Sequence, residues 1–203
     1  MLREMKFTNR EIKDLLLAWL MISLAFAILL SGIETLFSKP LLFLLSLGIS
    51  ALTAGVGFLF HELMHKYIAQ YYGLMADFKA FYKMLFLAIA FSFFGFIIAA
   101  PGAVFIHGFI TKEKNGKISL AGPLTNIILA ILFLILILLI NPEGVFGLIL
   151  FYGLMINSLL ALFNMIPFLP FDGGKVYAWN KLVYTIAVLT AFALFLSRYF
   201  ILN

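Results

Sequence analysis

Two histidines and a glutamate stand at the spacing of a metal-binding helix. The chain reads His61-Glu62-Leu63-Met64-His65, which places the two imidazoles at positions i and i+4. Side chains with this spacing lie on the same face of a helix, and a Glu between them is typical of helices that supply two zinc ligands and a general base. The sequence therefore predicts a metal centre in which His61 and His65 bind the ion and Glu62 transfers protons.

The sequence around this motif also favours metal binding. Residues 41–60, which precede it, contain no charged side chain. Burying a carboxylate and two imidazoles beside such an apolar stretch is costly unless these groups bind something. An alternative interpretation is an interfacial helix end whose polar side chains face lipid headgroups.

A catalytic zinc site usually has three protein ligands and an open position for water, so one ligand is still needed. We expect His107 to be an interfacial side chain and not a ligand. Four of the remaining acids lie in expected loops or at span ends, without a setting that favours metal binding: Glu34, Asp77, Glu113 and Glu143. Asp172 lies in a different setting, and it is the candidate that we favour.

Asp172 follows Pro167 and Pro170 and precedes two glycines. Two prolines this close together prevent a regular helix, and glycines permit a turn that other residues cannot form. We therefore expect an unwound segment, bordered by apolar spans, to carry this acid. The alternative is an ordinary Asp-Gly turn at a span end. Because His61 and His65 lack a third ligand, we predict that Asp172 supplies it and that the chain binds one Zn²⁺.

The composition places the whole chain in a membrane. Of its 203 residues, 65% are hydrophobic and 11% are charged, and the mean hydropathy is +1.13. Soluble domains have about 25% charged residues. The net charge of +5 then concerns orientation in the lipid bilayer and anionic lipids, and not nucleic acid. The chain has no cysteine, so any metal must be held by nitrogen and oxygen.

Six apolar runs approach or exceed the roughly 17–25 residues that a helix needs to cross a bilayer. They are Leu15–Ser31, Leu41–Ala69, Met84–Phe109, Leu124–Ile140, Val145–Pro167 and Val176–Ile201. We predict an all-α polytopic membrane protein with about five to six transmembrane helices. No linker or repeat divides the chain. We expect a single domain, residues 1–203, with a core at about 41–174 and peripheral spans at 12–32 and 176–201.

The third run differs from the others because Pro101-Gly102 interrupts it and the strand-like segment Ala103–Ile106 follows. Such a break at membrane depth requires protein or water to satisfy the freed backbone groups. We predict a re-entrant element, in which a helix enters the membrane and a strand returns. With a cytoplasmic N-terminus, this keeps the lysines of residues 112–117 inside, in agreement with the positive-inside rule.

The depth of the metal site agrees with this topology. His61 lies about 30 Å along its helix from Pro40, and Asp172 returns to the same side only if an even number of crossings intervenes. We therefore predict a multi-pass protein with a cytoplasmic N-terminus and an active site towards the cytoplasmic leaflet.

Four motifs follow one another along the chain. They are His61-Glu62-x-x-His65, Pro101-Gly102-Ala103-Val104, Gly122-Pro123-x-x-Asn126 and Asn164-x-x-Pro167-x-x-Pro170-x-Asp172-Gly173. In this order and spacing they resemble the site-2 protease family of intramembrane zinc metalloproteases, and the resemblance covers most of the chain, from the second apolar run to Gly174. Met64 is a departure, since members often carry glycine before the second His, but this position does not bind metal.

This resemblance implies a zinc metalloendopeptidase that cleaves transmembrane segments of membrane-tethered proteins, with zinc held by His61, His65 and Asp172 and with Glu62 as the base. Asn126 or Asn164 could hold the substrate backbone, because an Asn side chain both donates and accepts hydrogen bonds.

Other interpretations remain open at this stage. The strand-like segment could pair with an unwound substrate or simply pack against helices. A divalent-cation transporter and an inactive relative that binds membrane helices are the alternative functions.

Overall fold

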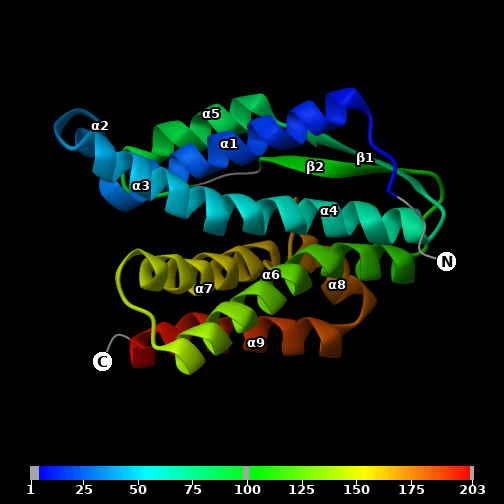
Figure 1. Cartoon of the computed structure of the whole chain (residues 1–203). Coiled ribbons are helices and arrows are strands. Elements are labelled where there is room, and N and C mark those ends of the chain that lie inside the picture. The colour runs from blue at the N-terminus through cyan, green and yellow to red at the C-terminus, as the bar shows by residue number, and fades with distance from the viewer. Residues whose placement is uncertain (1–4, 98–100, 202–203) are drawn as a thin grey trace.

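The protein is described here by a computed structural model, which covers residues 5–97 and 101–201 (Figure 1). Helices form most of it, with one small sheet. The elements are α1 (Asn9–Ser31), α2 (Glu34–Ser38), α3 (Pro40–Ser50), the π-helical turn η1 (Ala51–Gly55), α4 (Val56–Tyr71), β1 (Met75–Ala80), α5 (Tyr82–Ser92), β2 (Gly102–His107), α6 (Lys112–Ile140), α7 (Gly144–Asn164), α8 (Asp172–Trp179) and α9 (Lys181–Ile201).

Five helices in the described residues are long and apolar enough to cross a membrane. They are α1, α6, α7, α9 and the continuous 32-residue helix Pro40–Tyr71, which comprises α3, η1 and α4. This confirms the predicted all-α polytopic membrane fold. The third apolar run does not form one of these spans.

Helix α4 lies between two groups of elements (Figure 1). On one side, buried apolar residues of α1 and α5, such as Leu15 and Leu85, pack with Phe58 of α4. On the other side, α6 crosses α4 and packs with α7, α8 and α9 through residues such as Ile127 and Leu154. The helix with the paired histidines is therefore held from both sides.

The third run folds back on itself. Strand β2 contains the predicted segment Ala103–Ile106 and pairs antiparallel with β1, a strand that the sequence did not predict. Ala80 lies opposite Gly102 in this pairing, so the chain returns to the place where it left the sheet. The predicted helix and returning strand are present as α5 and β2, although residues 98–100 lie outside the described part of the chain.

Two carboxylates of α1 cover the outer edge of β1. Glu11 Oε1 accepts hydrogen bonds from the backbone N–H of Phe78 at 3.0 Å and from Lys66 Nζ at 2.5 Å. Asp14 Oδ2 accepts from the backbone N–H of Ala80 at 3.2 Å. Both acids are buried, as is Lys66. These side chains bind the backbone N–H groups of β1 that point away from β2, so helix α1 satisfies the donors that a third strand would otherwise bond on that edge.

The π-helical turn η1 lies within the long helix, just before α4. The indole N–H of Trp19, on α1, donates to the carbonyl of Ala51 at 3.2 Å. A side chain at Gly55 would meet Trp19 and Ser23, so glycine permits this close approach of α1. Single π turns occur frequently at functional sites, and this one fixes how α4 is rotated relative to α3.

The final apolar run also differs from its predicted bounds. Instead of one span from Val176, the chain forms the short helix α8 and then α9 from Lys181. Asn180 separates them with an extended backbone. Its side-chain oxygen accepts from the backbone N–H groups of Leu182 and Val183, which is the bonding of a helix N-cap.

Candidate metal centre

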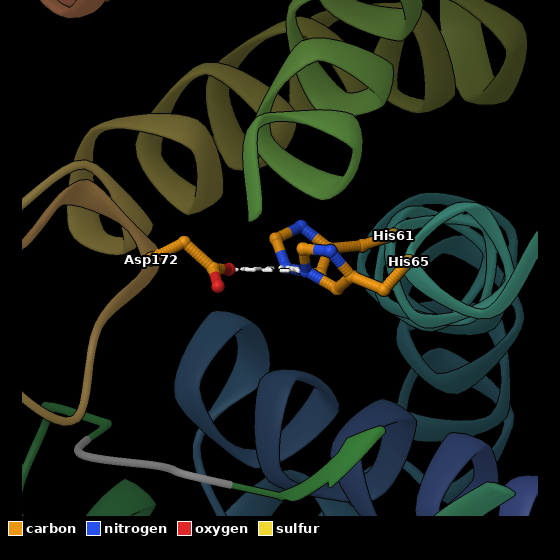
Figure 2. A group of neighbouring side chains, drawn as sticks. All are labelled: His61, His65 and Asp172. Carbon is orange, nitrogen blue, oxygen red and sulfur yellow. Dashed lines mark hydrogen bonds and ion pairs between the residues drawn. The ribbon is translucent and has the colours of Figure 1, made fainter. Parts of the chain in front are cut away.

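Helix α4 presents His61 and His65 on its face towards α6 and α8 (Figure 2). The spacing of four residues places the two rings one turn apart on the same face, as the sequence predicted, and the rings meet edge to face. Their Nε2 atoms lie 3.0 Å from each other, and both side chains are buried.

The chain brings Asp172 to the same point from a distant part of the sequence. After α7 ends at Asn164, residues 165–171 form no helix, and Asp172 begins α8. Its Oδ2 lies 3.5 Å from His61 Nε2 and 3.0 Å from His65 Nε2 (Figure 2). Burial acts to raise the pKa of the Asp172 carboxyl, while the two imidazoles, when protonated, hold this pKa well below its ordinary value.

The remaining ring nitrogens determine where the protons lie. His65 Nδ1 lies 2.7 Å from the carbonyl oxygen of Ile118, and His61 Nδ1 lies 2.6 Å from Asn126 Oδ1. An oxygen of this kind only accepts, so each Nδ1 carries a hydrogen and each neutral ring has a lone pair on Nε2. Two lone pairs and a carboxylate oxygen thus face one another, an arrangement that a cation stabilises.

The geometry of this group fits zinc. In a tetrahedral site with ligands at about 2.0–2.1 Å, ligand atoms lie about 3.3–3.4 Å apart. The three pairwise distances among His61 Nε2, His65 Nε2 and Asp172 Oδ2 lie between 3.0 and 3.5 Å. Among the described residues this is the one group of three side chains placed to hold a metal ion. Two imidazoles and one carboxylate leave the fourth position of a catalytic zinc site open.

Helix α6 approaches the imidazoles closely because Gly122 has no side chain. A Cβ at this position would meet the Nε2 atoms of both His61 and His65. The next residue, Pro123, lies inside the helix and removes the donor that would bind the carbonyl of Ser119. Gly122 and Pro123 therefore shape the wall of the metal centre.

Glu62 lies beside the metal centre without belonging to the ligand group. Its side chain is buried and lines the same cavity of about 600 Å³ as His61, His65 and Asp172. It makes no hydrogen bond to any other residue that the structure describes. A carboxylate next to the metal ligands, with its oxygens uncommitted, has the placement that a general base requires.

The two asparagines singled out by the sequence lie in different positions. Asn126 on α6 is fully buried, its oxygen faces His61, and its NH₂ group donates to the Gly57 carbonyl and to Asn157 Oδ1. Asn164, at the end of α7, lines the cavity and donates to the carbonyl of Leu160 at 2.9 Å.

His107 and the four acids set aside by the sequence lie outside the ligand group. His107 is half exposed, and its Nε2 lies 2.9 Å from Asp77 Oδ1 on the surface of the sheet. Glu113 is exposed and pairs with Lys117 one helical turn later.

Sequence reasoning missed three residues that support the imidazoles. The carbonyl of Ile118 carries no signal, because any residue type supplies one. Gly122 was noticed only as part of a motif, and Asn157 was not singled out. A signal for Asn157 existed, since an amide in the middle of the apolar helix α7 needs a buried partner.

Comparisons with known proteins give two relatives, both from Methanocaldococcus jannaschii. The chain is 43% identical over 183 residues to the protein named "Putative zinc metalloprotease MJ0611", a match that covers 89% of this chain and 90% of the relative. It is 34% identical over 122 residues to "Zinc metalloprotease MJ0392", covering 60% of this chain and 31% of that longer protein.

No model of a protein family matches the chain, and no solved structure matches it. The identity to the first relative extends over nearly the full length of both proteins and therefore includes the helices that form the metal centre. The chain belongs to the zinc metalloprotease family of which this relative is a member.

Proposed function

We propose that the protein is an intramembrane zinc metalloprotease of the site-2 type, which hydrolyses peptide bonds within transmembrane segments of membrane-tethered proteins. The convergence of His61, His65 and Asp172 beside Glu62 carries this proposal. Two further observations support it: the ligands lie on or next to helices that can span a membrane, and two relatives are named zinc metalloproteases.

His61, His65 and Asp172 hold the zinc in this proposal. When bound, zinc activates water for attack on the scissile carbonyl and stabilises the charge that develops on the carbonyl oxygen. Glu62 accepts a proton from the attacking water and then donates it to the leaving amine. Both transfers require a carboxylate that can move between proton donor and acceptor, which agrees with the absence of hydrogen bonds from Glu62 to other described residues.

A transmembrane helix hides its carbonyls in internal hydrogen bonds, so it must unwind before hydrolysis. The free edge of β2 offers a partner for the unwound segment. The backbone N–H of Phe81 donates to the carbonyl of Pro101, just beyond the paired residues. Because residues of an antiparallel strand bond alternately to its partner and away from it, the backbone N–H and C=O groups of Gly102, Val104 and Ile106 point away from β1. These three residues line the cavity that contains the metal centre.

We infer that the substrate adds to β2 as a further strand. The opposite edge, on β1, is covered by Glu11 and Asp14 of α1. The sheet therefore offers an extended chain its β2 edge, on the side where the metal ligands lie.

We further infer that the end of the molecule where α4 ends and α6 begins faces the cytoplasm. This lysine-rich end, as we call it, includes the N-terminal ends of α1, α6 and α9 and the short helix α8 (Figure 1). The basic residues in or just before these segments are Lys6, Arg10, Lys13, Lys112, Lys114, Lys117, Lys175 and Lys181. His65 lies about 9 Å and His61 about 15 Å along the helix from Tyr71, which places the metal centre nearer this face. Asn115, Ser119 and Lys175 line the cavity and give water a polar route to it.

The proposal is tested with purified protein and a membrane-tethered substrate in lipid vesicles. Glu62→Gln keeps the shape of the side chain but removes the base, so we expect unchanged zinc content and cleavage slower by about 10²–10⁴-fold. Glu113→Gln is the matched control, because this exposed acid lies outside the cavity.

Turnover by Glu62→Gln at the rate of the wild type would rule out Glu62 as the base. Cleavage outside the transmembrane segment of the substrate would contradict intramembrane proteolysis.

A further inference from the structure

A chain of side-chain hydrogen bonds connects His61 with helix α7. Asn157 Nδ2 donates to the carbonyl of Gly153 at 2.9 Å, and Asn157 Oδ1 accepts from Asn126 Nδ2 at 3.0 Å. Asn126 Nδ2 also donates to the carbonyl of Gly57 at 3.1 Å, and Asn126 Oδ1 lies 2.6 Å from His61 Nδ1. The chain thus runs from the interior of α7, through α6, to a metal ligand on α4.

The polarity of this chain is set at both ends by backbone carbonyls. A carbonyl only accepts hydrogen bonds, so the NH₂ group of Asn157 must face Gly153 and its oxygen must face Asn126. The NH₂ group of Asn126 then has both hydrogens engaged, by Asn157 and Gly57. Its oxygen is left for His61, which therefore carries its hydrogen on Nδ1.

We propose that Asn157 is a positioning residue for the metal centre: it fixes the orientation of the Asn126 amide and thereby the tautomer of His61 that directs a lone pair from Nε2 to the metal. The proposal rests on the zinc-binding part of the proposed function. Asn157 touches neither metal nor substrate in this role and acts only through Asn126.

Packing around Asn157 supports this assignment. Asn126 and Asn157 are both fully buried, so no water competes for their hydrogen bonds. A Cβ at Gly57 would collide with Asn157 Oδ1, which means that the close contact between α4 and α7 depends on glycine at this position. His65 needs no such chain, since a backbone carbonyl, that of Ile118, fixes its tautomer directly.

Two variants test the connection from opposite sides. Asn157→Ala removes the acceptor for Asn126, which frees the Asn126 amide to turn over. Gly57→Ala keeps every polar group but pushes Asn157 away, and alanine favours the helix at this position. Ser158→Ala is the control, because Ser158 is equally buried but bonds only to carbonyls of its own helix.

The first measurement is the zinc affinity of each purified protein, by competition with a chelator. We expect Asn157→Ala and Gly57→Ala to bind zinc about 10–100-fold more weakly, as for other partners of metal-bound histidines, and Ser158→Ala to match the wild type. The second measurement is the tautomer of His61 in metal-free protein, by nitrogen NMR in micelles. The chain has three histidines, which keeps the assignment simple.

Wild-type protein with the His61 hydrogen on Nε2, or both variants with unchanged zinc affinity, would overturn the proposal. If Asn157→Ala does not fold, Gly57→Ala decides the question. Failure of the proposed function is separately visible: a wild type that binds zinc but cleaves no membrane substrate contradicts the protease, while the tautomer and affinity results still stand.

Discussion

Each of the three side chains proposed to bind zinc is held by a different kind of group. A backbone carbonyl fixes His65, two buried amides fix His61, and Asp172 lies in the first turn of α8, where the helix dipole favours negative charge. The ligands thus depend on α6, α7 and α8 as well as on α4.

Asp172→Ala tests the third ligand. We expect zinc affinity to fall by more than the roughly 10–100-fold that the loss of an outer-shell partner causes, as measured by metal analysis after dialysis. Asp77→Ala is the control, since Asp77 pairs with His107 on the sheet surface. Full zinc occupancy in Asp172→Ala would mean that another residue supplies the third ligand.

The sequence predicted residues that act over short distances better than residues that act through distant partners. His61, Glu62 and His65 were readable because their spacing on one helix is local. Asp172 required elimination among the acids. The role of Asn126 was not readable, because its partners come from α4 and α7 and only the fold brings them together.

At the scale of elements, α1 does more than cross the membrane. Glu11 and Asp14 lie three residues apart on one face of this helix and bind successive outward N–H groups of β1. Glu11 also pairs with Lys66, the residue after His65. Helix α1 therefore links the sheet with the helix that carries the paired histidines.

The buried pair of Glu11 and Lys66 predicts a stability effect. Glu11→Gln still accepts from the N–H of Phe78 but leaves the Lys66 charge buried and unpaired, so we expect a loss of about 3–5 kcal/mol. Adding Lys66→Met should restore most of this loss, because the charge is then absent. Unfolding in detergent measures both, and an additive double variant would show that the two side chains do not interact.

The free edge of β2 predicts different effects of proline at two adjacent positions. Val104→Pro removes an N–H that points away from β1, so the sheet should remain while cleavage of a membrane substrate slows. Phe105→Pro removes an N–H that points to β1 and should disrupt the sheet itself. Cleavage rate, zinc content and thermal unfolding distinguish the two, and full activity in Val104→Pro would argue against strand addition.

Of the small sheet, the sequence predicted one strand. The β-branched residues of Ala103–Ile106 after Pro101 indicated β2. Strand β1 was missed because Met75–Ala80 contains Asp77 and Lys79 and reads as a polar loop. Its partners, β2 and the acids of α1, lie far away in the sequence.

At the scale of the whole molecule, most basic residues lie at one of the two ends of the helices. The opposite end carries the turn with Glu143, the segment of Glu34 and Lys39, and Arg198 in the last turn of α9. The re-entrant element accounts for this asymmetry, because a full crossing by the third run would move Lys112 and its neighbours to the other face. Lysine placement along the sequence therefore favoured the returning third run, whereas the packing of the helices could not be predicted from it.

This topology is testable by labelling, because the chain has no cysteine. Lys114→Cys should react with a membrane-impermeant reagent only from the cytoplasmic side, and Glu143→Cys only from the opposite side. Labelling of both from one face would contradict the five-span arrangement, and labelling in the reverse sense would contradict the proposed orientation.

The π turn at Ala51–Gly55 makes the direction of the two histidines depend on a backbone feature far from the chemistry. The π turn accommodates one residue more than a regular helical turn, and each residue advances an α-helix by about 100°. If the same residues formed regular α-helix, the following segment would swing around its own axis by about that angle, and His61 and His65 would leave the face towards Asp172 although neither had been altered. Deleting one residue of the turn would instead restore regular helix and keep the two histidines in place.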